Sequence, residues 1–226
     1  GVQCWSGDGR LCAFSHKDRG RSDGMIKRLW FRGLARARLY RRLTLTERPL
    51  SQPFPDVSAR VPVCVRVLAA GEIDAYMAFR PDQSIAEVRR RLDEGQQCFA
   101  VWHDRRIIHA TWAVTGRARI EYLSTELALA PDEFYSYDAF TSPAFRGLDV
   151  APARMLEMIR YFRDRGYRCQ VGALLPENRS GLRQGEKVGG RRHIGVIGYV
   201  GLGPWRHVFS RIERGASPPG RAGLAP

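Results

Sequence analysis

The sequence predicts an α/β domain built on a mixed, mostly antiparallel, twisted sheet that is flanked by helices. Three observations predict it. From residue 61 onward the elements follow in the order strand, two helices, three or four strands, helix, strand, helix, and one or two strands. The segment 103–105 reads as a tight turn that joins two strand-like runs into an antiparallel hairpin. A later pair of strands, 133–141 and 168–174, is separated by a helix and is expected to be parallel.

Each element has its own local signal. Runs rich in β-branched and aromatic residues predict strands over residues 61–68, 97–103, 106–115, 119–123, 133–141, 168–174, 191–201 and 205–211. Apolar stripes of helical period predict helices over residues 71–80, 84–94, 151–165 and 179–188. Ser84 and Glu87 predict a capping box at the start of the second helix, and Gly166 is expected to end the third.

The N-terminal part of the chain differs from the rest. Residues 1–24 are rich in Gly, Ser and charge, which predicts a disordered leader; whether they are native stays open, because the first methionine is Met25. Residues 25–48 predict a basic amphipathic helix that is separate from the main domain, with eight basic residues against one acid, a net charge of +7. A Pro-containing linker is expected over 49–60, the main domain over 61–211, and a flexible tail over 212–226.

The composition is strongly basic. Lys and Arg number 37 against 23 Asp and Glu, which gives a formal charge of +14. Such a charge implies an acidic partner, namely nucleic acid, anionic lipid or a phosphate-rich small molecule, unless it reflects an Arg-rich proteome. The five cysteines are widely spaced and outside any Cys/His cluster, so neither a disulfide framework nor a metal site is expected. The sequence shows no spanning segment or signal peptide, which predicts a cytoplasmic protein, soluble or peripheral at the inner membrane surface.

Two motifs carry the chemistry. The stretch RGLDVA, residues 146–151, lies between a strand and the start of a helix. The N–H groups and the dipole at such a helix start bind phosphate. After the next strand comes ENRSGLRQGEKVGG, with Asn178, Ser180, Glu186, Lys187 and Gly189. An ordinary tight turn between strand and helix is the alternative reading of the first motif.

The two motifs resemble those of the GNAT superfamily of acyl-CoA-dependent N-acyltransferases. RGLDVA is similar to the family signature Q/R-x-x-G-x-G/A, and the second motif is similar to the family's pattern of an Asn followed later by E-K-x-G-F. Two positions depart from the pattern: Asp149 stands where the family has Gly, and Gly190 where it has Phe. The resemblance implies a GNAT-like fold and an N-acyltransferase that moves an acetyl or longer acyl group from acyl-CoA to a primary amine.

The resemblance also implies which residues hold the co-substrate. The pyrophosphate of CoA would lie against Arg146, Gly147, Leu148, Asp149, Val150 and Ala151. A backbone N–H at Phe140 or Thr141 would stabilise the oxyanion, and Asn178 would contact the CoA arm. No metal is implied. The acceptor amine, small-molecule or lipid-associated, is not identified.

The candidates for proton transfer have structural alternatives. Asp138 and Glu121 are the candidate bases, and each could instead bind a cationic acceptor or form a structural ion pair. The family places an acidic Tyr at the position of Gly185 here, so Ser180, acting through water, is the substitute; it could equally be a plain helix-start Ser.

Two tyrosines and two histidines have structural explanations besides a catalytic one. Tyr135 and Tyr137 suit core or pocket lining as well as acid catalysis. His103 and His109 flank the hairpin turn and are expected to be exposed.

Two rival functions remain. Asp149 and Gly185 favour a catalytically degenerate acyltransferase fold that acts as a binding protein. The charge favours a nucleic-acid or membrane-surface module. Residues 61–226 lack the known nucleic-acid-binding patterns, and the apolar stripe of 25–43, with Ile26, Leu29 and Trp30, favours an anionic membrane surface.

Overall fold

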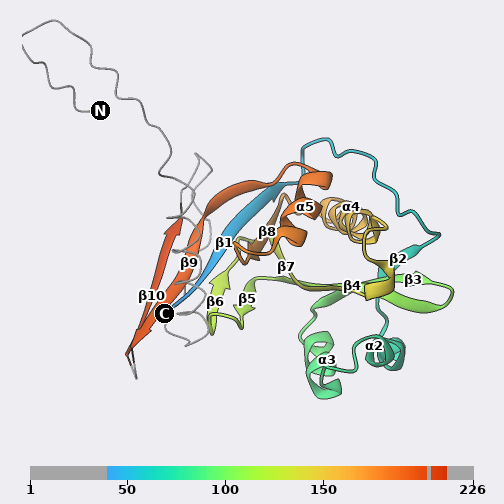
Figure 1. Cartoon of the computed structure of the whole chain (residues 1–226), viewed down its shortest axis with the longest axis horizontal. Coiled ribbons are helices and arrows are strands. Elements are labelled where there is room, and N and C mark those ends of the chain that lie inside the picture. The colour runs from blue at the N-terminus through green and yellow to red at the C-terminus, as the bar shows by residue number, and fades with distance from the viewer. Residues whose placement is uncertain (1–39, 203–204, 213–226) are drawn as a thin grey trace, which may run out of the picture.

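A computed structural model describes residues 40–202 and 205–212 (Figure 1). The strands are β1 (Tyr40–Pro49), β2 (Cys64–Val67), β3 (Gln97–His103), β4 (Arg106–Thr115), β5 (Arg117–Ile120), β6 (Thr125–Ala128), β7 (Glu133–Thr141), β8 (Cys169–Leu174), β9 (Arg192–Leu202) and β10 (Trp205–Ile212). The helices are η1 (Ala70–Glu72), α2 (Ile73–Phe79), α3 (Ile85–Asp93), η2 (Pro143–Phe145), α4 (Val150–Arg163) and α5 (Arg179–Val188). The main sheet has the strand order β10-β9-β1-β8-β7-β4-β3-β2, and β5 and β6 form a second, small sheet.

The predicted mixed, mostly antiparallel sheet is confirmed. β7 and β8 are the parallel neighbours, and the other neighbouring strands pair antiparallel. Their parallel pairing covers Glu133 to Tyr135 against Cys169 to Val171 and stops there, although β7 continues to Thr141. The two strands therefore separate toward their carboxyl ends.

The helices cover both faces of the sheet. Phe99 of β3 and Phe134 of β7 pack with Leu156 and Phe162 of α4. Cys98, the neighbour of Phe99, is buried instead in a cluster that includes residues of α2 and α3. Because successive side chains of a strand point to opposite faces, α4 lies on one face and α2 and α3 on the other (Figure 1).

The structure differs from the prediction for the segment before residue 61. Residues 40–48, assigned to the basic helix, form most of β1, which lies between β8 and β9 inside the sheet. Leu43 and Leu45 are buried there. Their period-two alternation indicates a strand, but the helical stripe upstream continues into it and obscured the boundary. Residues 25–39 of the predicted helix and the leader 1–24 lie outside the described residues, as does the tail from 213.

The predicted linker is packed against the domain. The N–H of Leu50 donates to the carbonyl of Arg168 (2.9 Å), and the N–H of Arg60 donates to the carbonyl of Leu148 (2.9 Å). The predicted strand 119–123 corresponds to β5, and its hairpin partner β6 was not predicted. Within the described ranges, no helix is both long and apolar enough to cross a membrane.

Candidate functional site

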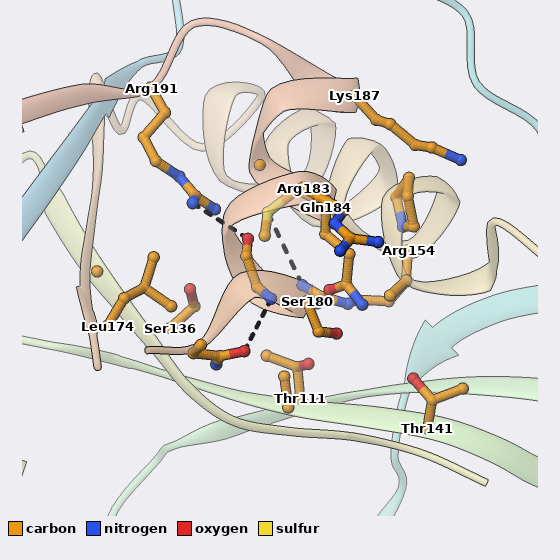
Figure 2. A pocket seen from close by; sticks show the side chains of 18 of the residues that line it. Thr111, Ser136, Thr141, Arg154, Leu174, Ser180, Arg183, Gln184, Lys187 and Arg191 are labelled. Atoms are coloured by element: carbon orange, nitrogen blue, oxygen red, sulfur yellow. Dashed lines mark hydrogen bonds between the residues drawn. The ribbon is translucent and has the colours of Figure 1, made fainter. Parts of the chain in front are cut away.

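A cleft of about 750 Å³ opens where β7 and β8 separate. Residues of β1, β4, β7, β8, α4 and α5 line it, so the cleft lies on the face of the sheet that α4 and α5 cover (Figure 2). Its opening includes both sequence motifs, because Arg146 to Ala151, with the exception of Leu148, and Asn178 belong to its lining. The described residues contain no group of three metal-ligating side chains.

The first motif leads into the N-terminus of α4 with two left-handed residues. Gly147 has φ +82° and Asp149 has φ +56°, and helical geometry begins at Val150. A glycine adopts such angles without strain, which explains the family preference for Gly at the position of Asp149. The N–H groups of Val150 and Ala151 are first-turn donors at the cleft, whereas Pro152 has no N–H to offer.

Leu148 does not take the predicted role through its side chain. It packs against the buried cluster of Val101, Ile108 and Val150, away from the cleft lining. Its carbonyl accepts the hydrogen bond from Arg60. This hydrogen bond connects the predicted linker, residues 49–60, to the first motif and holds the turn before α4 in place.

Asp149 lines the cleft, and its side chain does not cap α4. Its carboxylate pairs with Lys187 of α5 and with Arg60, whose Nε is 3.1 Å away. The hydrogen bond from Lys187, with a smaller contribution from Arg60, lowers the pKa of Asp149. Lys187 belongs to the second motif, so this ion pair joins the two motifs at the predicted phosphate site.

The end of β7 presents one backbone donor to the cleft. The N–H of Ser142 donates to the carbonyl of Ile108 (2.9 Å), which makes that pair a hydrogen-bonded one. The alternation of an antiparallel ladder then directs the N–H of Phe140 toward β4 and the N–H of Thr141 toward the cleft. Of the two predicted oxyanion donors, Thr141 has the suitable orientation.

Asp138, a candidate base, forms ion pairs in the structure. It lies at an irregularity of β7, with φ +49°, and lines the cleft. Its two carboxylate oxygens accept hydrogen bonds from Arg80 (3.1 Å) and Arg91 (3.0 Å). Both carboxylate oxygens are thus engaged by guanidinium groups, and this geometry favours a structural ion pair.

The other candidate base is not at the cleft. Glu121 lies exposed in the turn that follows β5, outside the cleft lining, so the fold does not bring it together with Asp138. Tyr135 is buried, and burial raises its pKa to about 12. Tyr137 lines the cleft and donates to Gln96, and burial raises its pKa as well. Both readings of these tyrosines, core and pocket lining, therefore apply.

The second motif forms α5 with the predicted bounds. Asn178 is its N-cap, and its Oδ1 accepts the N–H of Gly181 (2.9 Å). Ser180 is exposed at the start of the helix and lines the cleft. Gly185 is buried, and a Cβ there would overlap the guanidinium of Arg191. The space beside Gly185 is thus occupied by a side chain from the segment that leads into β9.

Two buried side chains were missed from the sequence: Arg154, which lines the cleft, and His109, which contacts two lining residues. His109, expected to be exposed, is only 1% exposed, and Arg154 of α4 is 2% exposed. Arg154 Nε donates to His109 Nε2 (3.1 Å), and Nδ1 of the ring is 2.7 Å from Thr141 Oγ1. Burial, followed by the charge of Arg154, lowers the pKa of His109 well below its usual value. The ring is therefore neutral, with its proton on Nδ1 and donated to Thr141.

A signal for Arg154 was present in the sequence. Residues 150, 154 and 158 share one face of the predicted helix, and Val150 and Met158 are apolar. An arginine within such a stripe is unusual. His109 had no comparable signal, because its strand has apolar residues on both faces and the sequence does not show which face a helix covers.

The comparisons with known proteins concern the fold. No family model matches the sequence, and no curated protein matches it. A GNAT-family structure from Novosphingobium aromaticivorans is 17% identical, with a TM-score of 0.49 over 70% of this chain and 63% of its own. A GNAT-family acetyltransferase from Colwellia psychrerythraea is 9% identical, with a TM-score of 0.50 over 68% of this chain and 53% of its own.

A third structure covers more of the chain. It is the GCN5-related glucosamine N-acetyltransferase region of a fungal multi-domain GH3 β-N-acetylglucosaminidase, which is 12% identical with a TM-score of 0.53. The match covers 84% of this chain and 23% of the fungal chain. This chain spans less than two thirds of each of these three relatives. At such identities the likeness establishes the architecture: the chain has the fold of the GNAT acetyltransferases.

Proposed function

We propose that the protein is an N-acyltransferase that transfers an acetyl or longer acyl group from acyl-CoA to a primary amine. The observation that carries the proposal is the cleft between β7 and β8, which opens at the N-terminus of α4 and combines both motifs. Acyl-CoA is the proposed co-substrate, because its pyrophosphate suits a helix N-terminus and its extended arm suits a gap between strands.

The donor would lie along the gap. Its pyrophosphate would accept hydrogen bonds from the N–H groups of Val150 and Ala151, with Arg146 adding positive charge. The helix cap uses only Oδ1 of Asn178, so its Nδ2 would donate a hydrogen bond to the CoA arm. The thioester carbonyl would then stand beside the N–H of Thr141.

In the reaction the amine nitrogen attacks the thioester carbonyl carbon, the C–N bond forms, and the C–S bond breaks. The N–H of Thr141 would stabilise the oxyanion of the tetrahedral intermediate. Its hydroxyl accepts from neutral His109, so its own hydrogen is available to the cleft. The proton lost by the amine ends on the departing thiolate; water, with Ser180 beside it, is the proposed carrier.

The binding step is tested by calorimetry with CoA. Arg146→Ala and Val150→Glu should each weaken binding by about 1–3 kcal/mol, because each removes or opposes a charge-assisted contact. Arg163→Ala, which removes an exposed arginine at the far end of α4, is the matched control and should bind CoA normally. Unchanged CoA affinity in both cleft variants would overturn the assignment.

A catalytically degenerate binding protein is the alternative function. Asp149 favours it, because its carboxylate lies at the proposed phosphate site, and so does Gly185, because no side chain there can serve as acid. Mass spectrometry of amine panels incubated with acyl-CoA distinguishes the two. CoA binding without any acylated product would support the alternative.

We also propose that the basic segment before β1 brings the domain to an anionic membrane surface and a lipid-associated acceptor. Residues 25–38 contain five basic residues and no acid. Each Lys or Arg near such a surface contributes about 1 kcal/mol.

A further inference from the structure

Arg154 is a buried cation without a counter-ion in the described part of the chain. It belongs to the cleft lining and is 2% exposed. Its Nε donates to His109, and its Nη1 lies 3.8 Å from the sulfur of Met155 and 3.7 Å from that of Met158. His109 is a neutral acceptor and the methionines are weak ones. None of these contacts balances the charge of Arg154.

The carboxylates of the cleft lining are engaged with other cations. Asp138 is held by Arg80 and Arg91, and Asp149 by Lys187 and Arg60. A third carboxylate, Glu47, pairs with Arg192 (2.8 Å). Since every lining carboxylate of the described residues has its own partners, the charge of Arg154 is left for a ligand.

A second buried guanidinium, that of Arg48, adds positive charge to the lining of the same cleft. Arg48 of β1 donates to the carbonyls of Gly185 (3.3 Å) and Gly189 (2.8 Å) and to Oε1 of Gln170 (2.7 Å). These acceptors are neutral and take three of the five N–H groups of Arg48. Burial, followed by the charge of Arg48, lowers the pKa of Arg154 to about 9, so Arg154 remains charged at neutral pH. A buried charge is costly unless it is paired.

The surroundings of Arg154 suit a small, planar anion. Gln170 Nε2 donates to Ser136 Oγ (2.7 Å), so the hydroxyl hydrogen of Ser136 can be donated onward. Ser136 and Thr111 line the cleft together with Arg154 (Figure 2). Arg154 lies one turn inside α4, beyond the first-turn N–H groups proposed to bind pyrophosphate. A carboxylate at this depth would take hydrogen bonds from a guanidinium and a hydroxyl.

We propose that Arg154 binds a substrate carboxylate and so makes the enzyme selective for an anionic substrate. The inference rests on the proposed acyltransferase function and deepens it. The carboxylate can come from two sources: the distal end of a dicarboxylic acyl group on CoA, or the carboxylate of an amino-acid acceptor. The pairing replaces the missing counter-ion of Arg154 when substrate is bound.

The first arm of the test uses plain anions and no CoA. Thermal unfolding is followed with succinate and, separately, with inorganic pyrophosphate, for the wild type, Arg154→Met and Arg154→Lys. Methionine matches the length of the apolar part of arginine beside Met155 and Met158, and lysine keeps the charge. Succinate should raise the melting temperature of the wild type and not that of Arg154→Met, whereas pyrophosphate should protect both.

The second arm measures selectivity. For the acyl source, kcat/KM is compared for succinyl-CoA and butyryl-CoA with one amine; for the acceptor source, L-amino acids are compared with their amides under acetyl-CoA. The wild type should prefer the carboxylate-bearing member of one pair by at least about tenfold, and Arg154→Met should lose that preference. Arg154→Lys should retain part of it.

The outcomes separate the two proposals. Absence of CoA binding, with succinate protection intact, would reject the proposed function and keep the anion site. Equal selectivity and equal succinate protection in wild type and Arg154→Met would overturn the anion site, whether or not acyl transfer occurs. Loss of pyrophosphate protection in Arg154→Met would also overturn it, since Arg154 would then bind the donor phosphate. If Arg154→Met does not fold, Arg154→Lys decides: a preference for the carboxylate smaller than that of the wild type supports the anion site, and an unchanged preference overturns it.

Discussion

The guanidinium of Arg191 occupies the space that a side chain on Gly185 would need. Arg191 Nη1 donates to the carbonyl of Gly181 (3.1 Å), one turn earlier in α5. Arg191 therefore fills the space on α5 that a side chain at position 185 would occupy. Gly185 and Arg191 should behave as a coupled pair.

A double-mutant cycle tests the coupling. In the wild type, Gly185→Ala gains helix propensity but displaces Arg191 from its hydrogen bond, so the two effects of about 1 kcal/mol each should nearly cancel. In an Arg191→Ala background the displacement cost is absent, and the same substitution should stabilise by about 0.5–1 kcal/mol. Urea unfolding measures both. Identical effects in the two backgrounds would show that the side chains do not compete.

The carboxylate of Asp149 is expected to weaken CoA binding. Asp149→Gly removes a negative charge from the proposed phosphate site, relieves the left-handed backbone and releases Lys187 for the ligand. CoA affinity should rise by about fivefold, equivalent to ~1 kcal/mol, and more at low salt than at high salt. Calorimetry at two salt concentrations measures it.

The control for this change is Glu157→Gln, which removes an exposed acid on α4 that pairs with Arg160. It should leave CoA affinity unchanged. Weaker binding by Asp149→Gly would mean that Asp149 positions Lys187 for the ligand rather than competing with it.

His109 should give the protein a pH-dependent stability between pH 5 and 6.5. Its pKa in the folded state is lowered well below 6.5 by burial and by Arg154. The unfolded chain takes up a proton near pH 6.5 and the folded one does not, so stability falls as pH falls through 6.5. The slope should approach about 1.4 kcal/mol per pH unit.

His109→Gln should flatten that slope, and His193→Gln, at an exposed position of β9, should not. Carboxylates with lowered pKa values, such as Asp149, change the stability only at pH values below this window, where they take up protons. Urea unfolding at several pH values provides the measurement. A wild-type stability that does not change from pH 6.5 to 5 would contradict the neutral, buried ring.

The sequence predicted the elements well where one local signal dominated. The helix 179–188 was predicted with the bounds that α5 has, because Asn178 caps it and Gly189 follows it. β1 was missed because a strand of alternating Leu43 and Leu45 follows directly on a helix-like stripe, and only its tertiary position between β8 and β9 distinguishes the two.

The site was predicted less completely than the fold. Motif residues such as Gly147 and Asn178 carry their signal locally, in a turn or a cap. Arg154 and His109 acquire their role from burial between α4 and the sheet, which no local pattern shows. Asp138 was identified, but its two arginine partners come from residues 80 and 91, far along the chain.

Asp138 should be a stability residue first. Asp138→Asn removes the carboxylate that Arg80 and Arg91 share and leaves each of these nearly buried arginines with one charged partner, Asp82 or Glu87. The loss of the two charge-assisted hydrogen bonds should destabilise the fold by about 2 kcal/mol. Glu121→Gln, at an exposed turn, should change neither stability nor turnover. Turnover of Asp138→Asn, measured well below its melting temperature, should stay within about tenfold of wild type. A larger loss in a folded variant would restore Asp138 as the base.

Truncations test the membrane proposal, and the position of β1 decides where they must end. Deletion of residues 1–48 removes a strand that pairs with both β8 and β9 and carries Arg48, so that chain should not give a cooperative unfolding transition. Deletion of residues 1–38 retains β1 and should keep folding and CoA binding. Deletion of residues 1–24 retains the five basic residues of 25–38 and is the matched control. In sedimentation with anionic liposomes at moderate salt, the full chain and the shorter deletion should pellet, and the deletion of 1–38 should remain in the supernatant. If all three behave alike, the segment does not bring the protein to a membrane.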